Sequence, residues 1–230
     1  MHGAMDDTTL RNLETRLTYL RNLQTRREEV KKSIENQGKL TQELADAIDA
    51  AATMTEVEDL YRPYKQKRRT RGSIAREKGL EGLAAAIFAQ DGSDPAVLAQ
   101  DYVNPEKGVE TVEDALQGAS DIIAEDLSDN ADIRKALRDL VMRKGTFICK
   151  AADDAEENGV YKLYYDFSQS ISRLLDHQIL AINRGEKEKK LKVKVSVDAE
   201  QIHALIGKDT LKGEKNIFYG MMQDTIADAY

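Results

Sequence analysis

Leucines recur near the start of the chain at the spacing of an α-helix. Over residues 8–37 they lie three or four positions apart and share one face: Leu10, Leu13, Leu17, Leu20 and Leu23. Gly38 then follows as a typical C-terminal stop. We predict one long helix whose stripe, including Leu13, Leu17 and Leu20, is buried against later helices.

Shorter helical patterns continue up to residue 145. Thr41 is expected to cap a second helix, and Thr55 with Glu58 has the spacing of a capping box at the start of a third. That third helix is expected to end near Tyr61, because the proline two residues later has no amide proton and disfavours a helical residue before it. Helical spacing resumes at Ser73 and recurs around residues 80–87, 95–100, 112–127 and 131–144.

One segment instead alternates apolar and polar residues, as a half-exposed strand does. It runs from Leu191 to Val197 and carries Lys192, Lys194 and Ser196 on its polar side. A strand needs a partner, which we expect from residues 147–151 or 160–165. Further helices are expected from Ser168 through Leu180 to a turn around Gly185, from Asp198, and over about 216–230.

These patterns predict a mainly α protein, an irregular multi-helix scaffold with a small β element near 147–197. We divide it into a helical region, 7–145, and a second helical region with the β element, 146–230. Residues 1–6, MHGAMD, resemble a cloning remnant. The last helix has no closing glycine, proline or basic turn, which indicates a truncation at the C-terminus.

Composition narrows the class of protein. A charged fraction of 33%, three prolines and no tryptophan in 230 residues favour long helices with solvated faces. The single Cys149 cannot form an internal disulfide and fits a reducing compartment. No apolar run approaches the ~20 residues of a membrane span. We therefore expect a cytoplasmic protein that does not enter a membrane.

The residues typical of catalysis do not form a recognisable site. Asp176 and His177 are adjacent, so on a helix their side chains point about 100° apart. Cys149 lacks a neighbouring histidine or cationic pair to lower its pKa. Residues 91–132 hold twelve acids and one base, but without the spacing of an EF-hand loop. The sequence predicts no catalytic residue, no metal site and no cofactor.

A basic segment, YRPYKQKRRTRGSIAREKG at 61–79, has eight Lys or Arg and one acid in a protein of net charge −7. Arginine binds phosphate oxygens in a bidentate way, and tyrosine rings stack on bases. The predicted nucleic-acid contacts are Arg62, Lys65, Lys67, Arg68, Arg69, Arg71 and Arg76, with Tyr61 and Tyr64. The alternative is that these cations pair with the acidic residues of 91–132.

Three stretches carry a family resemblance: TMTEVEDLYRPYKQKRRTRGSIAREKGLEGLA at 53–84, YYDFS at 164–168 and HQILAINRGEKEKKLKV at 177–193. They resemble the Tex family, bacterial transcription accessory proteins that bind nucleic acid. The last stretch is similar to a family turn that would make Arg184 a secondary contact, although family members usually have Arg where this chain has Gln178.

The resemblance implies a helical fragment of a longer protein. Family members continue into an RNase H-like domain, helix-hairpin-helix repeats and an OB-type RNA-binding domain, none of which is present here. It also implies a non-catalytic scaffold whose partners are RNA or DNA, bound without sequence preference and mainly by the absent domains, and possible contacts with the transcription machinery. Two alternatives stay open: a protein-interaction module docking on the transcription or translation machinery, and part of a nuclease-like enzyme.

Overall fold

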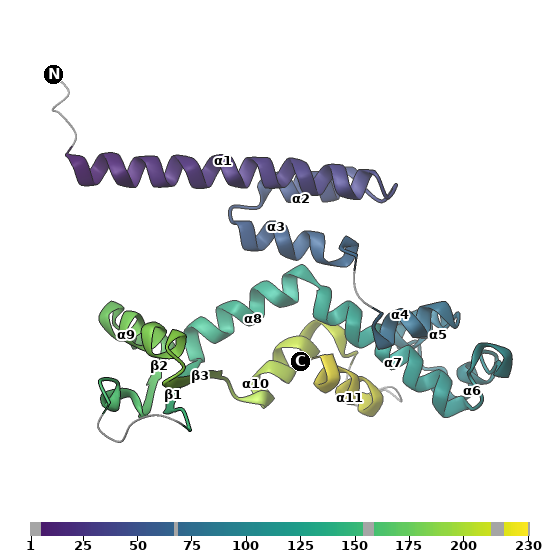
Figure 1. The fold of residues 1–230 in the computed structure, drawn as a ribbon. Coiled ribbons are helices and arrows are strands. Elements are labelled where there is room, and N and C mark those ends of the chain that lie inside the picture. The colour runs from purple at the N-terminus through teal and green to yellow at the C-terminus, as the bar shows by residue number, and fades with distance from the viewer. Residues whose placement is uncertain (1–5, 67–68, 154–158, 213–218, 230) are drawn as a thin grey trace. The chain divides into compact units, whose positions relative to one another are not determined.

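The computed structural model describes residues 6–66, 69–153, 159–212 and 219–229, which are mainly helical (Figure 1). These residues form eleven α-helices and one three-stranded sheet, so the predicted fold class is confirmed. The chain divides into two compact units, Met1–Thr70 with Asp129–Ala131 and Arg71–Ser128 with Asp132–Tyr230. None of the described helices has the length and apolar character needed to cross a membrane.

The first unit contains α1 (Asp7–Glu35), α2 (Gln42–Ala50), α3 (Met54–Tyr61) and the 3-10 turn η1 (Arg62–Tyr64). The side chain of Thr41 caps α2 as predicted. The capping box of α3 consists of Thr53 and Glu56, so the prediction of Thr55 and Glu58 is wrong. Both pairs have the same spacing, but it is the Thr53 side chain that accepts from the Glu56 amide, while the Glu56 carboxylate accepts from the Thr53 amide.

The leucine stripe of α1 is only partly buried. α2 and α3 lie along the C-terminal half of α1 (Figure 1), where Leu23, Val30 and Ile34 are buried. Four leucines of the N-terminal half are between 44% and 53% exposed: Leu10, Leu13, Leu17 and Leu20. The predicted burial of Leu13, Leu17 and Leu20 is therefore wrong. At about 1.5 Å per residue, helices as short as α2 and α3 can cover only part of α1.

The second unit holds the remaining elements. Its helices are α4 (Arg71–Glu77), α5 (Glu81–Ala89), α6 (Pro95–Gln100), α7 (Val112–Asp129), α8 (Ala131–Lys144), α9 (Asp176–Lys187), α10 (Ala199–Thr210) and α11 (Tyr219–Ala229), with the 3-10 turn η2 (Pro105–Lys107). Apolar side chains of α5, α7, α10 and α11 share one core, including Leu83, Ile123, Ile206 and Met222. Asp94 caps α6, and Asp198 caps α10 at the predicted start of that helix.

The β element is an antiparallel sheet of β1 (Thr146–Ala151), β2 (Asp166–Ser170) and β3 (Leu191–Ser196), in the order β2-β1-β3. The predictions of β1 and β3 are confirmed. The third strand lies at β2, whereas residues 160–165 contain the 3-10 turn η3 (Lys162–Tyr164). Ser168 lies in β2 and does not start a helix, because Phe167 pairs with Cys149 and packs in the core of the sheet.

Helix α9 follows the 3-10 turn η4 (Ile171–Arg173) and runs through the turn predicted around Gly185. That glycine is buried inside the helix because Leu191 and Tyr161 occupy the space where a Cβ would project. The helix therefore continues to Lys187, and the glycine allows close packing against the sheet. The prediction that the helix ends in a turn around this glycine is therefore wrong.

Candidate nucleic-acid interface

The basic segment begins with two tyrosines that belong to the core of the first unit. The Tyr61 hydroxyl lies 2.9 Å from Ser33 Oγ, and the Arg26 guanidinium lies over its ring, 5.6 Å from the centroid. Tyr64 packs against the same apolar cluster, and its carbonyl accepts a hydrogen bond from Gln37 Nε2 at 3.0 Å. These contacts fix the start of the segment. Base stacking by the two rings stays a prediction.

The cations that follow differ in their contacts. Arg62 Nε donates a hydrogen bond to Asp129 Oδ1 at 2.8 Å, and the aspartate, which belongs to the same unit, has a nearly buried side chain. Lys65 is exposed, with its ammonium 4.0 Å from a Glu58 oxygen. Arg69 is also exposed. The predicted contacts Lys67 and Arg68 lie outside the described residues.

In the second unit, Arg76 binds carboxylates on two helices. Its Nη1 donates to Glu125 Oε2 at 2.8 Å, its Nη2 donates to Asp126, and its Nε lies 3.4 Å from Glu81 Oε1. Glu125 and Asp126 lie on α7, the acidic helix. Arg71 lies 3.6 Å from another carboxylate of α7, that of Asp121. The acidic partners weighed as an alternative are thus present for Arg71 and Arg76.

Small residues bring α4 close to α7 behind these ion pairs. A Cβ on Gly72 would lie 3.0 Å from the Asp121 carbonyl oxygen and inside the contact distance of the Glu125 carboxylate. On α7, a Cβ on Gly118 would lie 3.4 Å from Ala75 Cβ of α4 and would overlap Leu80 Cδ1, beyond the end of α4. Sequence reasoning missed this contact, although its signal was present in the small residues of both helices.

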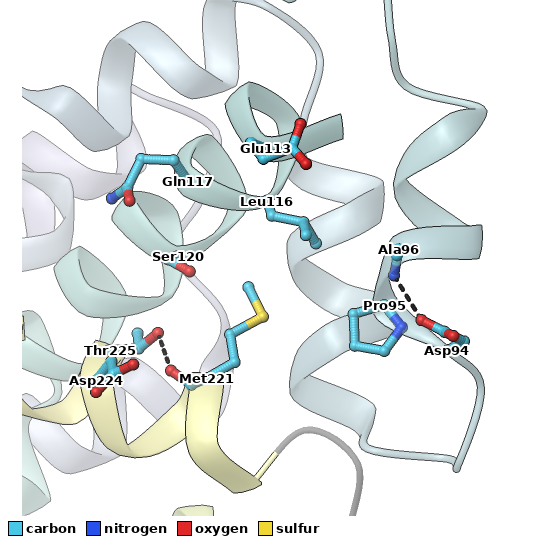
Figure 2. A pocket seen from close by; sticks show the side chains of 10 residues that line it. All are labelled: Asp94, Pro95, Ala96, Glu113, Leu116, Gln117, Ser120, Met221, Asp224 and Thr225. Carbon is cyan, nitrogen blue, oxygen red and sulfur yellow. Dashed lines mark hydrogen bonds between the residues drawn. The ribbon is translucent and has the colours of Figure 1, made fainter. Parts of the chain in front are cut away.

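A pocket of about 710 Å³ lies between α6, α7 and α11 (Figure 2). Leu116 and Met221 project into it, and three carboxylates surround it, those of Asp94, Glu113 and Asp224. The ten described residues that line the pocket include no Lys, Arg or His. An apolar interior with acidic surroundings suits a ligand that has both a hydrocarbon chain and a positive charge.

The remaining candidates are spread over the second unit. Arg184 is exposed on α9, and Asp176 and His177 are exposed at the start of the same helix. Cys149 is buried, and burial followed by the charge of Glu186 raises the pKa of its thiol. Among the described residues, no three His, Cys, Asp or Glu side chains form a group that could hold a metal ion.

Comparison with known proteins shows the family of this chain. The model of the Tex central region-like family matches residues 90–226, which include the acidic helix, the pocket and the sheet. The chain belongs to this family. The basic segment at 61–79 precedes the region that the family model matches.

Longer Tex-related proteins are similar to most of the chain. It is 44% identical to the protein tex of Bordetella pertussis over 199 residues, 86% of this chain and 25% of that protein. It is 38% identical over 81% of its length to the transcriptional accessory protein Tex of Neisseria gonorrhoeae, covering 24% of that protein. The human S1 RNA-binding domain-containing protein 1 is 31% identical over 84% of this chain and 20% of that protein. The chain therefore spans less than a third of the length of these relatives.

Proposed function

We propose that this Tex-family chain is a helical scaffold region of a nucleic-acid-binding transcription accessory factor and that it carries no catalytic site. The names of two relatives, a transcriptional accessory protein and an S1 RNA-binding domain-containing protein, support a role in transcription and RNA binding. The observation that carries the scaffold role is the set of carboxylates around Arg76, because they use a cation of the basic segment to join α4 to α7.

The exposed part of the basic segment is the proposed phosphate contact. Lys65 and Arg69 are exposed on either side of Lys67 and Arg68, and the protein as a whole is acidic enough to repel nucleic acid. Clustered cations therefore supply the local attraction that binding needs. Because phosphates carry no base information, this contact is indifferent to sequence.

A triple substitution tests the contact. Replacing Lys67, Arg68 and Arg69 with Gln removes three charges and leaves the Arg76 ion pairs intact. Each lost phosphate contact flattens the log–log salt dependence of single-stranded RNA binding by ~0.7, so we expect a change of about 2. The matched control replaces three exposed lysines of helices and loops outside this segment with Gln: Lys32, Lys39 and Lys208. Equal losses of RNA affinity for both triple variants would show that binding depends only on net charge. That result would contradict the proposed contact.

The non-catalytic part of the proposal has its own test. Purified protein is incubated with labelled single-stranded RNA and Mg²⁺ or Mn²⁺ over a range of pH. We expect intact RNA throughout. Metal-dependent cleavage that one carboxylate substitution abolishes would instead favour the nuclease-like alternative.

A second candidate function, protein interaction, is favoured by the acidic pocket. Its charges and apolar interior are complementary to a Lys or Arg side chain in a basic segment of another protein. A labelled peptide with one Arg between leucines serves as the probe in fluorescence anisotropy. Glu113→Gln with Asp224→Asn should weaken its binding, whereas the same loss of charge in Glu106→Gln with Asp139→Asn should not. Equal effects of the two double variants would exclude the pocket as the site.

A further inference from the structure

The three-stranded sheet has one covered face and one polar face. Cys149, Phe167 and Val193 pair across the strands on the face that packs with Ile182 of α9. Side chains of alternate residues point to opposite faces of a sheet. The other face therefore carries Thr146, Ile148, Lys150, Asp166, Ser168, Ser170, Lys192, Lys194 and Ser196.

Three lysines gather on this polar face, and we call Lys150, Lys192 and Lys194 the lysine face. Lys150 on β1 is directly opposite Lys192 on β3, and Lys194 follows on the same side of β3. All three are exposed. Like charges directly opposite each other disfavour strand pairing, so folding alone gives no reason for this arrangement. An anionic ligand between the two ammonium groups would remove the repulsion.

Nearby acids neutralise the lysine face only in part. Lys192 Nζ lies 2.7 Å from Asp153 Oδ2, but that aspartate is 94% exposed, and ion pairs between solvated groups are weak. Asp166 stands opposite Lys150 on its other side. Within the part of the chain that the structure describes, Lys150 and Lys194 form no ion pair. Residues 184–190, which lead into β3, add to the positive charge with four basic residues against two acids.

The other side chains of this face define what it can recognise. The aromatic residues of the β element, Phe147, Tyr164, Tyr165 and Phe167, all pack in the cluster on the covered side. The polar face therefore offers no ring for base stacking and instead presents ammonium groups and serine hydroxyls, among them Ser168 and Ser196. These groups bind phosphates, and the hydroxyls can also bind the 2′-hydroxyl of ribose.

We propose that the lysine face binds the phosphates of single-stranded RNA without reading its bases. This inference rests on the proposed function in a nucleic-acid-binding factor, and it names a surface separate from the basic segment. Three strands spaced about 4.8 Å apart make a face about 10 Å wide, which suits one backbone better than a duplex. Successive lysines on β3 lie roughly 6.7 Å apart, so Lys192 and Lys194 can bind separate phosphates of one extended strand.

Fluorescence anisotropy with a labelled uridine 15-mer tests the lysine face over a range of salt concentrations. Lys150→Gln, Lys192→Gln and Lys194→Gln together should flatten the log–log salt slope by about 2, since each contact with a single strand contributes ~0.7. Affinity at 50 mM salt should fall at least about tenfold. The control triple at Lys32, Lys39 and Lys208 should leave affinity within twofold. The midpoint of thermal unfolding of the lysine-face variant should not fall, because the repulsion between Lys150 and Lys192 is removed.

The outcomes separate this inference from the proposed function. A loss in the lysine-face variant that the control triple does not share supports it. If only the Lys67, Arg68 and Arg69 variant loses affinity, the lysine face is wrong and the proposed function stands. Equal losses for the lysine-face and control triples overturn the lysine face, and failure of the unaltered protein to bind the oligomer overturns both proposals. Equal affinity for the deoxyuridine 15-mer overturns the assignment to RNA.

Discussion

Arg76 Nη1 on α4 donates a hydrogen bond to Glu125 Oε2 on α7 across 2.8 Å, although the two residues are 49 positions apart in the chain. Both side chains are largely buried, with 29% and 14% of their surfaces exposed. Solvent screens the attraction between two charges less in such a position than at the surface. The contact therefore links a basic segment, which resembles a nucleic-acid site in sequence, to the folding of the second unit.

We predict that Arg76→Gln destabilises the protein by about 1.5–3 kcal/mol, as expected for a lost hydrogen bond between charged groups. The midpoint of urea unfolding measures the loss. Lys208→Gln, an exposed substitution with the same change of charge, should stay within about 0.5 kcal/mol of the unaltered protein. Unchanged stability together with weaker RNA binding would make Arg76 a ligand contact and not a scaffold residue.

The close contact of α7 with Leu80, the residue before α5, makes a second prediction possible. A methyl group at Gly118 would overlap Leu80, which is 1% exposed and has no room to move away. Overpacking of this kind costs about 1–3 kcal/mol. Gly118→Ala should therefore lower the free energy of unfolding, although alanine is the better helix former by about 1 kcal/mol.

Gly220 supplies the matched control for this prediction. It lies in α11, and a Cβ there would meet no atom within 4 Å. Gly220→Ala should leave stability unchanged or raise it by up to about 1 kcal/mol. If both variants gain stability, α7 packs less closely against Leu80 than the structure indicates.

Elements with a strong local signal were predictable from the sequence. The acidic helix α7 keeps its apolar spacing over five helical turns, and β3 alternates strictly between apolar and polar residues. Each can therefore be predicted without knowing what it packs against. Gly185 and Ser168 were misread because their roles depend on residues far away. Tyr161 and Leu191 fill the space beside the glycine, and pairing with β1 determines the strand that holds the serine.

The candidate site shows the same limit. The charge of the basic segment was visible in its composition. Which of its arginines bind carboxylates within the protein was not. Arg76 contacts Glu125 only because α4 folds back on α7, a relationship that no local pattern encodes. The lysine face likewise depends on the register of β1 with β3, which brings Lys150 opposite Lys192. A period-two pattern predicts alternate faces but not the residue across the strand.

The partial cover of α1 leads to a comparison within a single helix. Leu23 is 2% exposed and Leu17 is 44% exposed. Leu23→Ala should cost about 2–5 kcal/mol, because it removes buried methyl groups and leaves a cavity. Leu17→Ala should change the free energy of unfolding by about 0.5 kcal/mol or less, as surface substitutions do. Losses of similar size in chemical denaturation would mean that the N-terminal half of α1 is buried in solution.

The last prediction concerns Cys149, the single cysteine, whose side chain is buried between the sheet and α9. Burial disfavours the thiolate and raises the pKa of the thiol, and the negative charge of Glu186 adds to the effect. The thiolate is the form that reacts with alkylating agents. We therefore expect iodoacetamide to modify the folded protein very slowly at pH 7–8, as followed by intact mass.

Two further measurements complete the test of Cys149. In urea the thiol should react at the rate of a free cysteine, which shows that the fold is what protects it. Because the folded pKa is raised, the folded state holds the thiol proton more strongly than the unfolded state does. The resulting stabilisation is fully present below the unfolded pKa and is lost as pH rises through the folded pKa. Protection should therefore weaken only in the alkaline range, and rapid alkylation at pH 7 without denaturant would show that α9 does not cover this face of the sheet in solution.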